Sequence, residues 1–165
     1  MSLSWPQNVL SQLRSWSEKC YPYEGCGILL GHSTGDARKV RRFHPLSNLL
    51  HERNKVTSSH VMDVASASLG KRVESQGQFE FVMNPEEFNK AVLSAEKEGL
   101  DVVGVLHTHP DHPAKPSATD AAQPLLAGWS NVIVKVDKGQ YIEARSWFRQ
   151  EESDPFQEET ITLEG

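Results

Sequence analysis

The feature that most constrains this chain is an apolar run at residues 102–106 that ends in two histidines, His107 and His109, separated by one threonine. A short run of valine and leucine bounded in this way is typical of a buried strand. Residues two positions apart in a strand point to the same face and lie about 7 Å apart along the chain. We therefore expect both imidazoles to face one point at the end of a buried strand.

A carboxylate follows this pair at Asp120, in what we interpret as the first turn of a helix that begins at Ser117. Two imidazoles and one carboxylate give three protein ligands and leave one position for water, as in catalytic zinc sites, whereas structural zinc sites usually have four protein ligands. Each part also has an ordinary explanation, because His-x-His can be two plain histidines at a strand end and Ser-x-x-Asp resembles a helix capping box. The end of a strand is where open α/β sheets hold ligands, which favours a site.

The composition narrows the class of protein. A chain of 165 residues predicts one domain with a core of its own. It has 17 basic and 22 acidic residues and no long basic block, so we do not expect a nucleic-acid partner. No apolar run approaches the length of a membrane span and no signal-peptide pattern opens the chain. Cys20 and Cys26 could pair by count, but we expect reduced thiols in a cytoplasmic protein.

Strand and helix patterns alternate, which predicts an α/β or mixed α+β sheet flanked by helices. Helices are expected at residues 5–19 and 85–98, the second after an Asn84 cap with proline at its first position. Strands are expected at residues 25–31, 37–45, 78–83, 101–107, 129–136 and 141–148, with a short edge strand at 161–163.

Weaker patterns predict a strand at residues 54–57, a helix at 59–75 and a helix start at 117–126. Residues 110–116 hold three prolines and are expected to be neither helix nor regular strand. Residues 1–3 and 164–165 are interpreted as remnants of an expression vector and are left out of the expected fold.

The motif His107-x-His109-Pro110, followed after six residues by Ser117-x-x-Asp120, resembles the JAMM motif of the MPN (Mov34/PAD-1) metalloproteases. That family also carries a glutamate upstream, and the Tyr-Glu-Gly-Cys-Gly-Ile-Leu-Leu-Gly segment at residues 23–31 is similar to the segment that bears it. The order of elements continues to match as far as residue 148, so the resemblance covers most of the chain. The compact size and the Glu-Gly-Cys-Gly form are most similar to bacterial members, which process ubiquitin-like sulfur-carrier proteins.

The resemblance implies an MPN fold, which is a curved mixed β-sheet flanked by helices. This fold is cytidine-deaminase-like. It implies a single domain at residues 1–149 and an acidic tail at 150–165. It further implies a zinc-dependent peptidase or isopeptidase that cleaves after the C-terminal glycine tail of a ubiquitin-like or sulfur-carrier protein. Such a tail would fit by adding as a strand to a sheet edge.

Carried over to this sequence, the family pattern implies one zinc ion per chain, held by His107, His109 and Asp120. Glu24 would take a proton from the zinc-activated water, and Ser117 would stabilise the developing oxyanion. Zinc lowers the pKa of its water to about 7, and one nearby glutamate can serve as base and then as acid. Iron or another divalent ion suits the same ligands.

Other interpretations remain open or are excluded by the residues present. A non-catalytic MPN scaffold is the main alternative, although such modules typically lose a ligand or the glutamate, and this chain keeps every position. A zinc deaminase needs His-x-Glu and Cys-x-x-Cys, which the sequence lacks. Cys26 lies in an apolar strand and is expected to be a buried thiol rather than a nucleophile.

The sequence constrains the roles of some further residues, the oligomeric state and the substrate less strongly. We interpret His112 as a solvated loop histidine, and Trp129 and Trp147 as core residues. Residues 59–75 are expected to form a flap or helix beside the cleft. The oligomeric state, a homodimer included, and the identity of the carrier protein are left open.

Overall fold

The structure, a computed structural model, describes residues 1–48, 83–118 and 127–164. Within these ranges the chain forms seven strands and two helices. In chain order they are β1 (Ser2–Pro6), α1 (Gln7–Cys20), β2 (Cys26–Thr34), β3 (Ala37–Leu46), α3 (Pro85–Lys97), β4 (Asp101–Pro110), β5 (Ser130–Asp137), β6 (Gln140–Phe148) and β7 (Gln157–Glu164).

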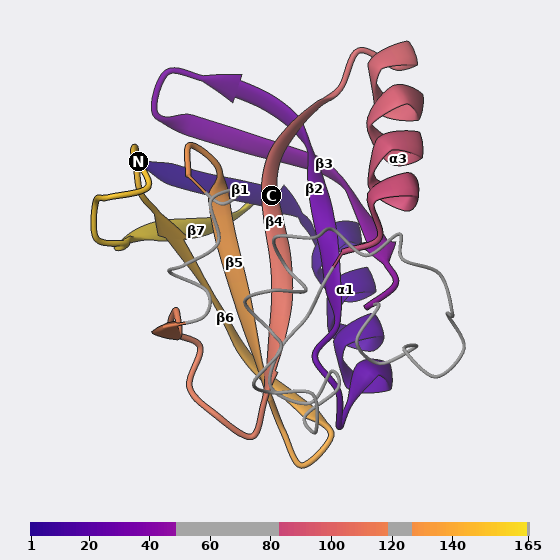
Figure 1. The fold of residues 1–165 in the computed structure, drawn as a ribbon, viewed down its shortest axis with the longest axis vertical. Helices are drawn as coiled ribbons and strands as arrows, with labels where there is room; N and C mark the ends of the chain where they lie inside the picture. Colours follow the sequence, from indigo (N-terminus) through magenta and orange to yellow (C-terminus); the bar gives the residue numbers. More distant parts are fainter. Residues whose placement is uncertain (49–82, 119–126, 165) are drawn as a thin grey trace.

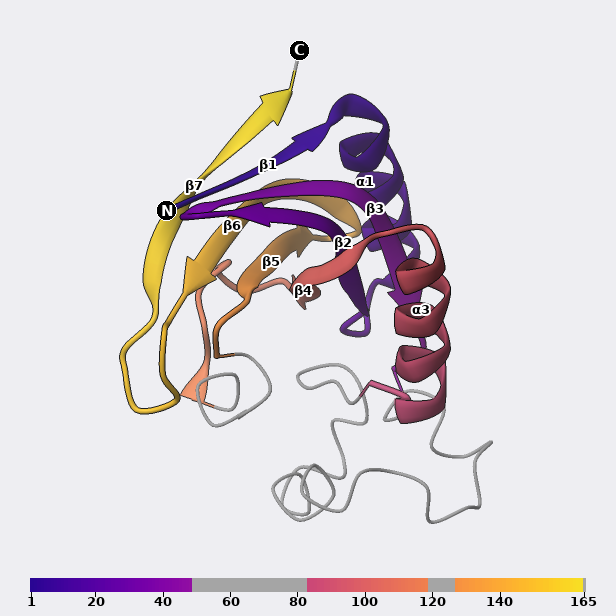
Figure 2. The same ribbon diagram turned by 90° about the horizontal axis from the view of Figure 1, so that it is seen from above.

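The described strands form one mixed sheet that curves until its two ends meet (Figures 1 and 2). The hydrogen-bonded order is β1-β3-β2-β4-β5-β6-β7, and β1 pairs with β7 to close the ring. The β4–β5 pair and both pairs made by β1 are parallel, whereas the remaining pairs are antiparallel. The predicted mixed sheet flanked by helices is confirmed, and it forms a closed ring.

The two helices cover opposite faces of β2. Ile28 and Leu30 pack in a cluster with residues of α3, whereas Leu29 packs in a second cluster with residues of α1. Because neighbouring residues in a strand point to opposite faces, burial on both sides requires an unbroken apolar run. This explains why the sequence of β2 contains a continuous apolar stretch and not an alternation of apolar and polar residues.

Helix α1 also supplies hydrogen-bond partners where the strand ring is incompletely paired. The β1–β3 register ends at Lys39, and the β6–β7 register covers only residues 146–148 of β6. Beyond these points, the Gln12 side chain donates to the Phe43 carbonyl of β3 at 3.2 Å, and Glu18 accepts from the Tyr141 amide of β6 at 2.8 Å. Backbone groups at a strand edge without a neighbouring strand need such partners or water, since an unpaired group is costly where water is excluded.

Several predicted elements are confirmed with small shifts in their bounds. The Asn84 side chain accepts hydrogen bonds from the Glu86 and Glu87 amides, and Pro85 begins α3, as the cap pattern predicts. The hairpin of β2 and β3 turns at residues 35–36, later than expected, because β2 continues through Thr34. Strand β4 likewise extends through Pro110.

Both ends of the chain belong to the sheet, which corrects their exclusion from the expected fold. Ser2 and Leu3 belong to β1, and the Leu3 side chain is fully buried in the core, so the first helix begins only at Gln7. The predicted edge strand is longer, and it lies between β1 and β6 rather than at an edge. Glu164 pairs with Pro6 of β1 and forms an ion pair with Arg41.

Other predictions fall outside the described residues. The strand at 54–57, the helix or flap at 59–75, most of the strand at 78–83 and most of the helix at 117–126 lie there. None of the described helices has the length and apolar character needed to cross a membrane.

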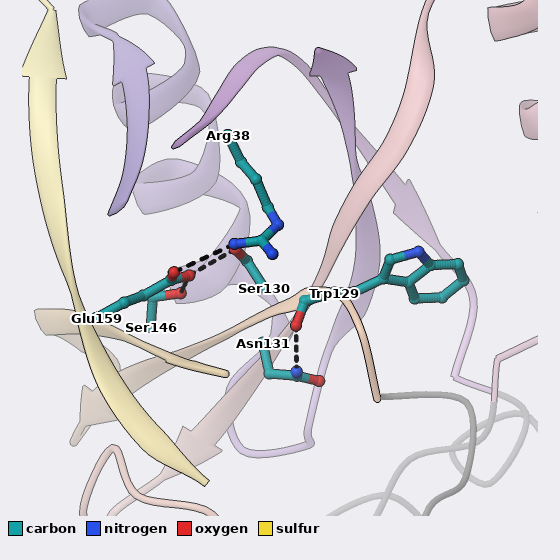
Figure 3. A network of polar contacts seen from close by, with 6 residues as sticks. All are labelled: Arg38, Trp129, Ser130, Asn131, Ser146 and Glu159. Atoms are coloured by element: carbon teal, nitrogen blue, oxygen red, sulfur yellow. Dashed lines mark hydrogen bonds and ion pairs between the residues drawn. The ribbon is translucent and has the colours of Figure 1, made fainter. Parts of the chain in front are cut away.

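A buried polar cluster joins β7 to three other strands (Figure 3). Glu159 of β7 accepts from the hydroxyls of Ser130 at 2.5 Å and Ser146 at 2.7 Å, and it pairs with Arg38 of β3 at 3.4 Å. The Arg38 guanidinium also stacks on the Phe148 ring. Because β7 shares only three paired positions with β6, this cluster contributes to fixing the last strand in the ring.

We expect Glu159→Ala to lower the free energy of unfolding by about 3 kcal/mol, because it leaves Arg38 buried without its counter-ion. The neighbouring Glu158→Ala is the matched control, since Glu158 forms an exposed ion pair with Arg145 that should contribute less than about 1 kcal/mol. Urea denaturation followed by circular dichroism measures both values. Equal losses for the two variants would contradict a stabilising role of the buried cluster.

Candidate metal centre

The two histidines of β4 meet as the sequence predicts. His107 and His109 are each 1 % exposed, and their Nε2 atoms lie 3.1 Å apart. The strand that carries them is held between two neighbours, since His107 pairs in register with Cys26 of β2 and Ile133 of β5. Strand alternation and burial together therefore point both imidazoles at one place.

The loop after β4 fixes the orientation of the His109 ring. Its Nδ1 lies 2.6 Å from the Pro113 carbonyl oxygen, and because a carbonyl only accepts, the proton sits on Nδ1. The Nε2 lone pair then faces His107 and is available to a metal ion. The His112 ring stacks on His109 with centroids 4.1 Å apart, so His112 supports the site and is not merely solvated.

Glu24 is brought to these histidines by hydrogen bonds of its own backbone segment. The Gly25 amide donates to the Thr108 hydroxyl at 2.8 Å, and the Thr108 amide donates to the Gly25 carbonyl at 3.0 Å. The Asn48 side chain donates to the Glu24 carbonyl at 2.7 Å. Glu24 is 2 % exposed, so its carboxylate lies inside the protein and not on a solvated loop.

The glycine after Glu24 leaves room for two side chains of α1. A Cβ atom on Gly25 would lie 2.5 Å from the Cys20 sulfur and 2.8 Å from the Trp16 ring, at the end of α1. Distances this short would require the Cys20 and Trp16 side chains to move. The Glu-Gly pair thus allows the end of α1 to pack directly against the segment that carries the acid.

Glu24, His107 and His109 form a compact group whose candidate ligand atoms all lie within 4.8 Å of one another. Two imidazole nitrogens on one tetrahedral zinc ion at about 2.0–2.1 Å stand about 3.3 Å apart. The observed separation of the two Nε2 atoms, 3.1 Å, is close to this value. The donor set and its spacing therefore fit a divalent metal ion.

The structure says less about the two remaining predicted site residues, Ser117 and Asp120. Ser117 is half-buried at the end of the loop after β4, and Asp120 lies outside the described residues. Their assignments as oxyanion donor and third ligand stay predictions.

The sequence did not indicate two residues that hold the Glu24 segment, Thr108 and Asn48. Thr108 faces away from the histidines and binds the Glu24 segment, a role that strand alternation between two histidines could have indicated. Asn48 had no sequence signal, because its partner is a backbone carbonyl 24 residues away. The adjacent Ser47 is in turn held by the Glu87 carboxylate of α3, which accepts from the Ser47 amide at 2.7 Å and hydroxyl at 2.9 Å.

The loop after β4 is anchored at two further points. The Asp111 carboxylate accepts from the Tyr21 hydroxyl at 2.6 Å and from the Lys138 amide at 2.8 Å. The bond from the Lys138 amide, followed by that from Tyr21, lowers the pKa of Asp111, and the bond to Asp111 raises the pKa of Tyr21. Farther along, the Trp147 indole donates to the Ala114 carbonyl at 3.0 Å, so Trp147 holds the loop and is not only a core residue.

Cys26 is not placed for nucleophilic chemistry. Its side chain is fully buried, and its sulfur contacts the carbonyl oxygens of Leu46 and Ser47. Burial above all, with nearby negative groups second, raises the pKa of the Cys26 thiol well above its ordinary value. The thiol therefore stays protonated, and the expectation of a buried, inert cysteine is confirmed.

Comparison with known proteins agrees with this geometry. The family described as prokaryotic homologs of the JAB domain matches residues 6–150. A desampylase from Haloferax volcanii is 29 % identical over 157 residues, covering 95 % of this chain and 90 % of the relative. A desampylase from Pyrococcus furiosus is 32 % identical over 110 residues, covering 60 % and 75 %.

Solved structures show the same fold. A protein from Desulfitobacterium hafniense is 26 % identical with a TM-score of 0.73, and the match covers 98 % of this chain and 92 % of that one. A JAB1/MPN domain protein from Archaeoglobus fulgidus, 15 % identical with a TM-score of 0.50 and coverages of 98 % and 99 %, shows the fold alone. The resemblance seen in the motif thus extends over nearly the whole chain, which belongs to the prokaryotic homologs of the JAB domain and is a hydrolytic enzyme of that family.

Proposed function

We propose that this enzyme is a metal-dependent peptidase or isopeptidase that hydrolyses the bond after the C-terminal glycine tail of a ubiquitin-like or sulfur-carrier protein. The observation that carries the proposal is the buried group of Glu24, His107 and His109, with ligand atoms within 4.8 Å of one another. The two relatives named desampylases support a substrate of the ubiquitin-like class. The free thiols of Cys20 and Cys26 suit the cytoplasmic location expected from the sequence.

In this proposal His107 and His109 hold one zinc ion together with Asp120, and the ion when bound supplies water of lowered pKa. Glu24 takes the proton from the attacking water and returns it to the leaving amine. Thr108 binds the adjacent Gly25 and Asn48 binds the Glu24 carbonyl, so the backbone from which the carboxylate extends is held in place. Ser117 donates to the developing oxyanion.

The closed ring limits how a substrate tail can bind. Each described strand has a hydrogen-bonded neighbour on both sides over part of its length, so the ring offers no whole free edge. The expected addition of the tail as an extra strand is therefore restricted to stretches beyond the paired registers. The tail's glycines suit such a narrow approach, because they let a backbone come close to its neighbours.

The first test replaces Glu24 by glutamine. We expect Glu24→Gln to keep about one zinc per chain and to lose hydrolysis by at least about 100-fold, because amide and carboxylate have the same shape but only the carboxylate accepts the proton. Zinc is measured by elemental analysis. Cleavage is measured by intact mass on ubiquitin-like and sulfur-carrier proteins extended beyond their C-terminal glycines.

Glu96→Gln on the exposed face of α3 is the matched control and should behave as wild type. Wild-type hydrolysis by Glu24→Gln would show that Glu24 is not the base. Loss of zinc in that variant would instead make Glu24 a ligand. If the wild-type enzyme cleaves none of the extended carriers, the substrate class proposed here is wrong.

The second test addresses the metal itself and the alternative of an inactive scaffold. We expect His107→Ala to reduce zinc content below about one-tenth of the wild-type level, because two protein ligands hold a divalent ion far more weakly than three. His32→Ala, an exposed histidine on β2, should leave the content unchanged. Freshly purified wild-type protein that is empty and cannot be reloaded with zinc would favour the scaffold over the enzyme.

A further inference from the structure

Asp111, two residues after His109, adopts a backbone conformation that side chains rarely take. Its φ is 60°, and the other non-glycine residue with positive φ in the described part of the chain is Lys138, at 51°. The two are in direct contact, since the Lys138 amide donates to the Asp111 carboxylate at 2.8 Å. Such conformations are unfavourable and persist only where the surroundings fix them.

Three hydrogen bonds fix Asp111. Its own amide donates to the Val136 carbonyl at 2.8 Å, and its carboxylate accepts from both Lys138 and the Tyr21 hydroxyl, the latter at 2.6 Å. The Tyr21 ring lies against the same turn, because a Cβ atom placed on Gly139 would be 3.8 Å from its Cδ1 atom. The strained turn and the tyrosine therefore converge on one carboxylate.

The Tyr21–Asp111 bond joins the two segments that carry the site. Tyr21 lies three residues before Glu24, in the segment between α1 and β2. Asp111 begins the loop after β4, whose Pro113 carbonyl binds His109 and whose His112 stacks on the same ring. The bond spans 90 positions of sequence and ties the backbone of the acid to the loop that orients a histidine.

We propose that Tyr21 and Asp111 are positioning residues, which hold the Glu24 segment and the His109 loop at a fixed relative distance. This rests on the proposed function for the role of Glu24, but the geometry of the histidine pair can be tested separately. The ordinary alternative is a surface hydrogen bond that only stabilises the fold. If Tyr21 is a positioning residue, removal of its hydroxyl also changes metal binding. If the bond serves stability alone, metal binding stays the same.

Tyr21→Phe is the sharpest test, because it removes only the hydroxyl and leaves the ring to pack against the turn. Tyr141→Phe is the matched control: Tyr141 packs against the same core cluster and lies outside the Tyr21–Asp111 link. Asp111→Gly is a second variant that removes the carboxylate while a glycine still accepts the positive φ. Asp154→Asn, in the loop before β7, controls for loss of an exposed acid that binds a backbone amide.

The experiment loads each protein with cobalt(II) in place of zinc, and records the visible spectrum and the cobalt dissociation constant. For Tyr21→Phe and Asp111→Gly we expect an altered absorption band and a dissociation constant raised about 10-fold, in the range found for residues that orient metal ligands. On a cleavable carrier, kcat should fall about 10-fold while KM stays within about 2-fold, because positioning acts on the reacting geometry. Both controls should match wild type.

The proposal is overturned if both variants melt at lower temperature but keep the wild-type cobalt spectrum and affinity, since the link would then serve the fold alone. If the wild-type enzyme cleaves no carrier, the proposed function fails, yet the cobalt measurements still decide the positioning role. If cobalt binding changes in the two variants and not in the controls, the link sets the geometry of the histidine pair.

Discussion

The double hydrogen bond between Gly25 and Thr108 is the interaction on which the site depends. The ladder between β2 and β4 ends at the pair Cys26 and His107, one residue short of Gly25. The Thr108 amide and hydroxyl prolong that ladder by one step, and this step places Glu24 beside the histidines. One face of β4 thus carries the two imidazoles, and Thr108, which lies between them in sequence, binds the segment that carries Glu24.

Much of this could be predicted because it depends on local patterns. The cap at Asn84, the apolar run of β2 and the spacing of His107 and His109 each follow from the geometry of a single helix or strand. The grouping of Glu24 with the histidines was inferred from resemblance, since a lone glutamate beside glycine carries no local signal. The structure brings these three residues together, while the catalytic roles of Glu24 and Ser117 stay predictions.

Contacts between distant segments account for what the sequence did not show. Strand β4 contains a bulge opposite Leu29 and Leu30, so Val103 and Val105 pack in different clusters although simple alternation puts them on one face. The partners of Asn48 and Tyr21 lie 24 and 90 positions away, where no periodicity can reveal them. Strand β1 is short, and its pairing with β7 joins segments so far apart in the sequence that no local pattern indicates it.

The parallel pairing of β1 with β7 also has a consequence for how the chain folds. Residues Ser2–Pro6 pair with Thr160–Glu164, so the ring closes between segments that lie far apart in the sequence. Without this pairing, β1 would have β3 alone beside it, paired over Ser2–Ser4. Because the loop-closure entropy of such long-range pairing opposes it until the contacts form, we expect ring closure, with the burial of Leu3 and Trp5, to be a slow step of folding.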